Sequence, residues 1–340
     1  MHVRSSGVQP RPPADPGTPP SSTARAGYAV IAVAVVAVLA VSVWSLLHSG
    51  LLGRTPEPSA SATVAGPAIS SYAEKAKRLT WEPPELTSPE TILITQKNRR
   101  LELLPDRDYR IVLPDTPITL DGGLEIRGGR NIVLFGGEIV VPPESEAPKD
   151  SERTGLLLKD QFGTAYVEGV KISGQDLAEG INLDQRYGAT VILQNIEVGL
   201  VHGSYEGHHA DILQTWAGPR TLLVDGLRGT TQYQGLFLLP QQFIDDEPER
   251  FDLRRILIVG DTSGPEGQAA YLLWTDAPAT WLSTQDIVLV DPRDDLEGMI
   301  KPYGPWEDGV RLSKTTDDAV LPAGTPGVGY VSPGYQGEAP

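Results

Sequence analysis

Between residues 90 and 291, apolar and polar side chains alternate in short runs that are interrupted by Gly, Asn, Asp and Pro. This period of two is typical of strands with one buried face and one exposed face. No stretch in the region has the period of a convincing amphipathic helix. The pattern therefore predicts an all-β domain.

The apolar runs of this domain resemble one another. Each is followed about ten residues later by a second apolar run, and the spacing between first runs is 25, 30, 25 and 35 residues. Length thus varies between the runs and stays fixed inside them, which indicates a solenoid with irregular insertions pushed into loops. The five first runs, beginning at residues 155, 180, 210, 235 and 270, are GLLLKD, GINLDQ, ADILQT, GLFLLP and AYLLWT.

The block resembles the right-handed parallel β-helix proteins of the pectate-lyase-like superfamily, over roughly residues 90–291. The resemblance implies a stacked solenoid fold, but no single activity, because the superfamily holds lyases, hydrolases, epimerases, adhesins and phage spikes. An antiparallel β-sandwich is the alternative fold. It is disfavoured because two-residue Asn-Gly or Asp-Gly hairpin turns are missing between the runs.

Aligned without gaps, the first runs predict which side chains face the interior. The fourth position is always Leu, so alternation places the second position inside with it and the third and fifth outside. The predicted inward residues are Leu156, Ile181, Asp211, Leu236 and Tyr271, with Leu158, Leu183, Leu213, Leu238 and Leu273. The predicted outward residues are Leu157, Asn182, Ile212, Phe237 and Leu272, with Lys159, Asp184, Gln214, Leu239 and Trp274.

Neighbouring coils stack about 4.8 Å apart, so Lys159, Asp184 and Gln214 would form a polar ladder on the surface, continued by apolar Leu239 and Trp274. Polar groups beside an exposed aromatic ring suit a sugar-binding face, and the alternative is an ordinary solvated strand face. The candidate substrate-binding residues are Gln214, Asn182, Tyr205 and Trp274.

An uncharged apolar stretch at residues 28–47 is long enough to cross a bilayer as a helix. Arg residues precede it and are scarce after it, which predicts a cytoplasmic tail at 1–27 and an extracytoplasmic remainder. A Pro/Ser/Ala-rich stalk would occupy 48–89 and a loosely ordered tail 292–340. The sequence thus predicts a single-pass bacterial cell-envelope protein. A cleaved signal peptide is the alternative, because small residues follow the span.

Composition narrows the partners. Residues 1–54 carry a formal charge of +3, which leaves −19 for the rest of the chain, since the whole chain carries −16. Such a domain repels phosphate backbones, so nucleic acid is disfavoured as a partner, and a neutral glycan, a basic surface or a bound divalent cation is easier to accommodate. There is no cysteine, which excludes disulfides and thiolate metal sites.

All three histidines of the domain, His202, His208 and His209, fall within eight residues. Histidine moves protons near neutral pH, and the carboxylate of Asp211 could orient a ring. The predicted catalytic set combines this cluster with the ladder: His208, His209, Asp211, Asp184 and Lys159. A purely structural histidine cluster remains the alternative.

Two reactions on a polysaccharide would use these groups. Elimination on a uronate needs a base and a cation, for which the candidates are His208, His209 or Tyr205, with Lys159, Lys171 or Arg186. Hydrolysis needs two carboxylates, for which Asp184 pairs with Asp160 or Asp211. GHH at 207–209 faintly resembles the Gly-His-Gly of polygalacturonases, but their other motifs and the arginine motif of pectate lyases are absent.

Acidic residues also crowd the loop after the fourth run. Hard oxygen ligands could bind Ca²⁺, but the run lacks the Gly-punctuated spacing of a dedicated calcium loop, so a solvated loop is preferred and no metal ligand is assigned. These residues are Asp245, Asp246, Glu247 and Glu249. The sequence as a whole predicts a protein that acts on or binds an envelope or extracellular polysaccharide, with a non-catalytic glycan- or protein-binding module as the alternative.

Overall fold

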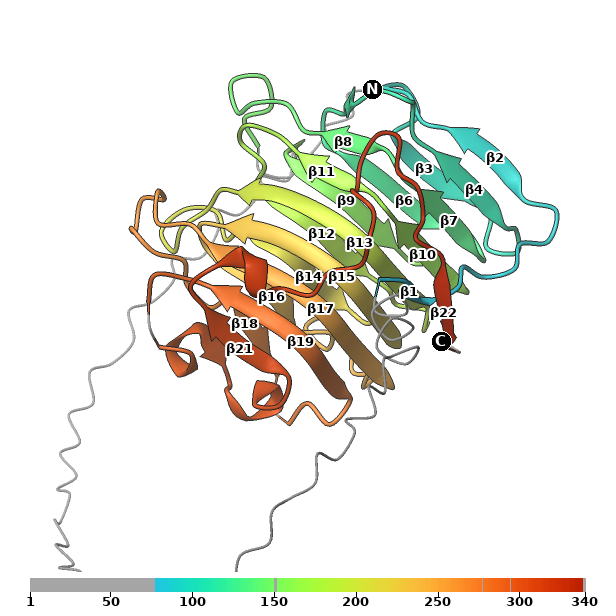
Figure 1. The fold of residues 1–340 in the computed structure, drawn as a ribbon. Helices are drawn as coiled ribbons and strands as arrows, with labels where there is room; N and C mark the ends of the chain where they lie inside the picture. Colours follow the sequence, from blue (N-terminus) through green and yellow to red (C-terminus); the bar gives the residue numbers. More distant parts are fainter. Residues whose placement is uncertain (1–76, 150–151, 277, 294, 339–340) are drawn as a thin grey trace, which may run out of the picture. The chain divides into compact units, whose positions relative to one another are not determined.

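The structure is a computed structural model and describes residues 77–149, 152–276, 278–293 and 295–338. Within these residues the chain winds into a parallel β-solenoid of about 7 turns, of the right-handed type (Figure 1). The strand pairs of its two large sheets are parallel, which confirms the predicted all-β solenoid and rules out the antiparallel sandwich.

The strands of the described residues form three sheets, of twelve, eight and two strands. The main path of the twelve-stranded sheet is β2 (Glu90–Leu93), β4 (Tyr109–Val112), β7 (Ile132–Phe135), β10 (Thr164–Glu168), β13 (Thr190–Val201), β15 (Thr221–Thr231), β17 (Arg250–Gly260), β19 (Leu282–Val290) and β21 (Val310–Ser313). Three short strands pair beside this path: β5 (Ile118–Thr119), β8 (Glu138–Val140) and β11 (Lys171–Ser173).

The eight-stranded sheet forms the opposite wall of the solenoid. In spatial order it contains β3 (Arg100–Leu103), β6 (Leu124–Gly128), β9 (Thr154–Lys159), β12 (Glu179–Asp184), β14 (Asp211–Ala217), β16 (Gln234–Leu238), β18 (Leu273–Thr275) and β20 (Ile300–Lys301). Apolar side chains from both walls fill one continuous core between them. Stacking is what makes this possible, because a single coil cannot bury its apolar face alone.

Each long strand of the twelve-stranded sheet bends at one residue with a left-handed backbone conformation, and these residues occupy equivalent positions in neighbouring coils. Register places Asn195 beside Gly226, and Arg255 beside Asp286, in neighbouring coils. All four have positive φ, a conformation that glycine, Asn and Asp tolerate and that is uncommon for Arg. The bend turns each strand around the core: in β13, Leu193 before it and Ile196 after it both belong to the core, while Gln194 faces outward.

The fourth-position leucines of the first runs are fully buried, as predicted. The gapless alignment, however, is wrong for β14 and β18: Leu213 pairs with Ile181 and Leu236, and Leu273 pairs with Leu236. The shift is two residues, so the faces are kept along most of each strand. Gln214 consequently stacks on Asn182 and Phe237, and leaves the predicted ladder of Lys159 and Asp184.

The inward and outward prediction fails at the start of β14 and β18. Ile212 and Leu272 belong to the core, although they were expected outside, whereas Asp211 and Tyr271 line an external cavity. The reason is that each of these strands begins at a corner of the coil, where two successive side chains point inward and strict alternation is lost.

Residues after Val290 differ from the expected loose tail. The solenoid continues through β20 and β21, with short 3₁₀ helices η2 (Glu297–Met299), η3 (Gly304–Trp306) and η4 (Thr316–Asp318). Residues 319–338, the C-terminal strap, then cross the outer face of the twelve-stranded sheet (Figure 1). The strap ends in β22 (Tyr335–Glu338), which pairs with β1 (Leu79–Trp81), part of the expected stalk.

Candidate functional site

A cavity of about 690 Å³ lies on the outer face of the eight-stranded sheet. Strands β14, β16, β18 and β20 supply its floor and one wall, because their outward positions stack in register from coil to coil. Loops before β14, β16 and β18 supply its rim. The cavity therefore combines residues that lie up to about a hundred positions apart in the sequence.

One wall of the cavity is aromatic. Register stacks Phe237 on Trp274 and Trp274 on Lys301. The ring of Trp274 stands edge-to-face against Phe237, with centroids 5.0 Å apart, and against Tyr271, with centroids 5.5 Å apart. The Lys301 ammonium lies 4.1 Å from the centroid of Trp274, a cation–π contact. The wall thus presents apolar ring surface next to a positive charge.

On the floor of the cavity and beside it, three buried oxygens lack a hydrogen-bond partner among the described residues. Asp211 is 1 % exposed, and neither its Oδ1 nor the Oε1 of Gln214 has a hydrogen-bond partner. In the neighbouring coil, Asn182 stacks on Gln214; its Nδ2 donates to Glu179, but its Oδ1 is also unpaired. Buried polar atoms are usually paired, so these oxygens mark positions at which water or a ligand would supply the donors.

Asp211 is held as a neutral carboxylic acid. Burial raises the pKa of Asp211 well above its usual range, and the charge of Glu179 raises it further. Glu179 lies two residues before Ile181, as Asp211 lies two before Leu213, so the two carboxyl groups occupy equivalent positions in neighbouring coils. These surroundings favour the protonated form of Asp211, which is the form that donates a proton.

The rim of the cavity is built around His209. Its ring is stacked between Tyr205 and Tyr233, with centroids 6.0 Å and 4.8 Å away. His209 Nε2 lies 3.0 Å from the carbonyl oxygen of Tyr205, and because a carbonyl only accepts, Nε2 carries the hydrogen. The exposed carboxylate of Glu266 accepts the Tyr205 backbone N–H at 2.5 Å, which ties the loop before β18 to the rim.

Five of the predicted site residues line this cavity: Tyr205, His209, Asp211, Gln214 and Trp274. Two more lie beside it. His208 Nε2 is 3.4 Å from Glu179 Oε1, and Asn182 contacts the same carboxylate. The histidine cluster is thus divided, with the ring of His209 at the cavity rim and the ring of His208 against the half-buried carboxylate of Glu179.

Lys159 and Asp184 do not line the cavity. Asp184 is buried between Lys159 and Arg186 and bonds to both. Burial raises the pKa of Asp184, but the hydrogen bonds from Arg186 and Lys159 outweigh it and hold this pKa below its usual range. The group therefore stays ionised and paired, as expected of a structural ion pair. Lys171, the third cation considered, pairs with Glu138 at 3.2 Å.

The acidic loop offers no metal site. Asp245, Asp246 and Glu247 are exposed, while Glu249 pairs with Arg220 at 2.6 Å. Among the residues that the structure describes, no group of three or more His, Asp and Glu side chains could hold a metal ion.

Sequence reasoning missed part of the cavity. Phe237 was recognised only as an outward residue, and Tyr271 was assigned to the interior. Glu179, Tyr233, Glu266 and Lys301 were not singled out, because each comes from a different coil and no local motif connects them. Lys301 was missed because residues 292–340 were expected to form a loose tail, whereas β20 continues the sheet and places Lys301 next to Trp274.

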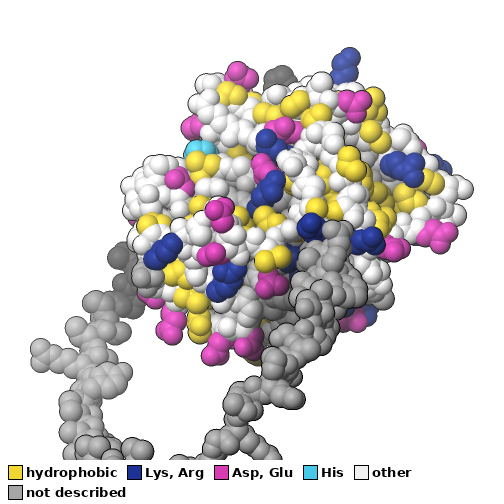
Figure 2. Space-filling model, viewed as in Figure 1, with side chains coloured by type: hydrophobic (Ala, Val, Ile, Leu, Met, Phe, Trp, Pro, Cys, Tyr) yellow, Lys and Arg dark blue, Asp and Glu magenta, His cyan; other side chains and the backbone are white. Residues whose placement is uncertain are grey.

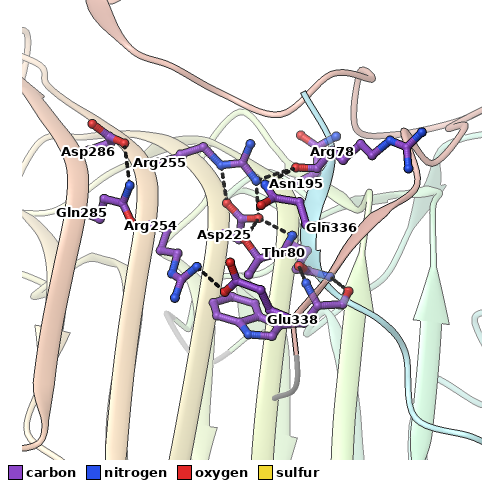
Figure 3. Close-up of polar contacts among 12 residues, drawn as sticks. Arg78, Thr80, Asn195, Asp225, Arg254, Arg255, Gln285, Asp286, Gln336 and Glu338 are labelled. Atoms are coloured by element: carbon purple, nitrogen blue, oxygen red, sulfur yellow. Dashed lines mark hydrogen bonds and ion pairs between the residues drawn. The ribbon is translucent and has the colours of Figure 1, made fainter. Parts of the chain in front are cut away.

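A second buried polar cluster, centred on Asp225, lies under the strap and β1, and its charged side chains are paired (Figure 3). Fully buried Asp225 accepts hydrogen bonds from Arg255 and from the backbone N–H and hydroxyl of Thr80 in β1. Arg254 bonds to Glu338 of β22, at 2.7 Å. These contacts fasten both ends of the described chain to the solenoid. Across the face that carries the strap, acidic and basic side chains are interspersed rather than gathered by sign (Figure 2).

The fold and the site together define a β-solenoid with a lateral, aromatic-walled cavity. Comparison of the chain with protein-family models, with curated proteins and with solved structures finds no match.

Proposed function

We propose that the cavity on the eight-stranded sheet binds a polysaccharide. The observation that carries the proposal is the placement of Trp274 and Phe237 beside the unpaired oxygens of Asp211 and Gln214. The C–H face of a sugar ring packs on an aromatic side chain, and its hydroxyl groups donate hydrogen bonds to acceptors such as these. One ligand would therefore satisfy both halves of the cavity.

Size and charge support a sugar over other ligands. The cavity of about 690 Å³ lies within the range of about 300–1,000 Å³ that is typical of small-molecule sites. Its lining mixes amides, hydroxyls and aromatic rings, with Lys301 and Glu266 of opposite charge. A polyhydroxylated ligand that is neutral or weakly charged suits this lining better than a strongly charged one.

Titration of the full-length chain with a panel of neutral and uronate-containing polysaccharides, followed by tryptophan fluorescence and calorimetry, tests the proposal. Trp274→Ala is expected to weaken binding at least about fivefold, since stacking on an aromatic ring contributes about 1 kcal/mol or more. Phe162→Ala is the matched control, because Phe162 is an exposed aromatic outside the cavity lining, stacked on Tyr187. Equal affinity of the Trp274 variant and the parent would refute the proposed site.

We also propose that residues 28–47 anchor the protein in the cell membrane, with the solenoid outside and the N-terminus cytoplasmic. Within the part of the chain that the structure describes, no helix is long and apolar enough to cross a membrane, and residues 28–47 lie outside that part. The support is the uncharged stretch and the arginine asymmetry around it. Protease shaving of intact cells should remove the solenoid and spare a tag at residue 2; the opposite pattern would reverse the orientation.

The relation to the pectate-lyase-like superfamily is likewise a proposal. It rests on the parallel coils, which support the fold class but not an activity.

A further inference from the structure

We infer that the cavity also cleaves the glycan that it binds, by hydrolysis, with Asp211 as general acid and Glu266 as general base. The inference rests on the proposed binding function and adds a reaction to it. Hydrolysis of a glycosidic bond needs two carboxyl groups in opposite protonation states on either side of the bond. The cavity contains two carboxyl groups in contrasting surroundings, since Asp211 is buried and Glu266 is exposed.

Asp211 fits the acid because of where it lies. It is 1 % exposed at the floor, beneath the space a ligand would occupy, and its Oδ1 has no partner within the described residues. Burial and the neighbouring Glu179 keep it protonated. A buried carboxylic acid with no structural hydrogen bond has a proton free to give to a leaving oxygen.

Glu266 fits the base because its surroundings are the reverse. It is exposed on the loop before β18, where water reaches it, and the Tyr205 N–H holds one of its oxygens in place. Both Glu266 and Asp211 raise the pKa of Tyr233 after burial does, so both carboxyl groups lie near that ring. Tyr233 thus stays protonated and lines the same cavity as the acid and the base.

The reaction balances without a cofactor. Asp211 gives its proton to the glycosidic oxygen as the bond from that oxygen to the anomeric carbon breaks. Glu266 takes a proton from water as the water oxygen forms a bond to the same carbon. The products are a new reducing end and a free hydroxyl, and exchange with solvent returns the proton from Glu266 to Asp211. Water is the only co-reactant.

The pattern of cations favours hydrolysis over elimination. Elimination needs a cation free to neutralise a uronate, and Lys159, Lys171 and Arg186 are each paired with a carboxylate. Lys301 keeps its charge at the cavity, where its ammonium rests on the ring of Trp274, so an elimination would depend on Lys301. His209 is positioned as a spacer between Tyr205 and Tyr233, and we assign it a positioning role at the rim.

The test uses the full-length chain and each polysaccharide that it binds. New reducing ends without unsaturated products are expected. Asp211→Asn and Glu266→Gln should each slow turnover by about 10²–10⁴-fold while the dissociation constant changes less than threefold. Glu307→Gln, an exposed carboxylate outside the cavity lining, is the matched control and should retain full turnover. Azide added to Glu266→Ala should restore cleavage and yield a glycosyl azide, which a structural role for Glu266 would not produce.

The outcomes separate the two proposals. Binding without any new reducing end overturns hydrolysis and leaves the binding function intact. No binding to any glycan overturns both. Unsaturated products establish elimination instead, and turnover that survives Asp211→Asn removes Asp211 from the mechanism. Thermal unfolding of each variant identifies a loss of activity that is caused by misfolding, since Asn and Gln keep the shape of the parent side chains.

Discussion

The outer faces of the two large sheets bury polar side chains of the same kinds, but in different states of pairing. On the twelve-stranded sheet, Glu168, Gln194 and Asp225 stack in register under the strap and β1. Glu168 accepts from the hydroxyls of Tyr166, Tyr330 and Tyr335, and Gln194 exchanges hydrogen bonds with the backbone of Trp81. On the eight-stranded sheet, Asp211, Gln214 and Asn182 each keep an unpaired oxygen.

This difference in hydrogen-bond pairing distinguishes polar groups that stabilise the fold from polar groups that are available to a ligand. Under the strap, the chain itself supplies the partners, so burial of the polar groups contributes to folding and fixes where the ends attach. At the cavity nothing in the described chain supplies them, so the groups lower stability in the free protein. Such a cost persists where a ligand compensates for it. The paired face is therefore the anchor of the fold, and the unpaired face is the candidate site.

The largest effect is expected from the centre of the paired face. Asp225→Ala leaves the guanidinium of Arg255 buried without its counter-ion, so the free energy of unfolding should fall by about 3–5 kcal/mol. Urea unfolding measures the loss. Asp246→Ala, at an exposed carboxylate, should stay within about 0.5 kcal/mol of the parent. A small effect of Asp225→Ala would mean that the attachment of β1 and β22 to the solenoid does not stabilise it.

A smaller loss of stability is expected from Glu168, at the other end of the stack that contains Gln194 and Asp225. Glu168→Gln turns an acceptor oxygen into an N–H₂ group that faces tyrosine hydroxyls, and should cost about 1–3 kcal/mol. Because Tyr330 and Tyr335 belong to the strap, amide exchange in β22 should accelerate more than in β12. Uniform exchange in both strands would show that the strap and the solenoid open together. The exposed Glu144→Gln is the control.

On the face with unpaired groups, removing a carboxylate should raise the free energy of unfolding instead of lowering it. The pKa of Asp211 is raised in the folded protein, so stability is fully present below the ordinary carboxyl pKa and falls as pH rises, because only the unfolded chain releases this proton. Asp211→Asn removes that penalty. It should stabilise the protein at pH 7–8, by an amount that grows as pH rises above the ordinary carboxyl pKa, and leave it unchanged near pH 3. Unfolding curves at both pH values decide the matter; destabilisation at neutral pH would contradict the neutral-acid assignment.

The smallest change in stability is expected at Gln214, which can be compared with Gln194, a glutamine on the other sheet. Gln214→Leu removes an unpaired acceptor and should change stability by no more than about 0.5 kcal/mol, while it weakens glycan binding. Gln194→Leu removes three hydrogen bonds beneath the strap and should cost about 1–3 kcal/mol. Denaturant midpoints of the two variants measure the contrast. Equal losses would mean that Gln214 is paired in solution.

The sequence by itself determined the class of fold. The period of two, the recurrence of the runs and the leucine column predicted stacked parallel coils, and Leu158, Leu183, Leu213, Leu238 and Leu273 are all buried. These features are local, because each coil repeats the same requirement to bury one face of a strand. The cluster of Tyr205, His209 and Asp211 was also visible as a local composition.

Three features were decided by the tertiary structure alone: the register of β14 and β18 with their neighbours, the pairing of β1 with β22, and the set of residues that lines the cavity. A two-residue shift keeps the hydrophobic pattern of β14 and β18, so the sequence could not detect it, yet it changes which side chains are neighbours across coils. β1 and β22 meet from opposite ends of the described chain, with no pattern that links them. Lys301, Glu266 and Glu179 reach the site and its floor only because stacking brings separate coils together, and pairing between coils is a non-local property that periodicity does not record.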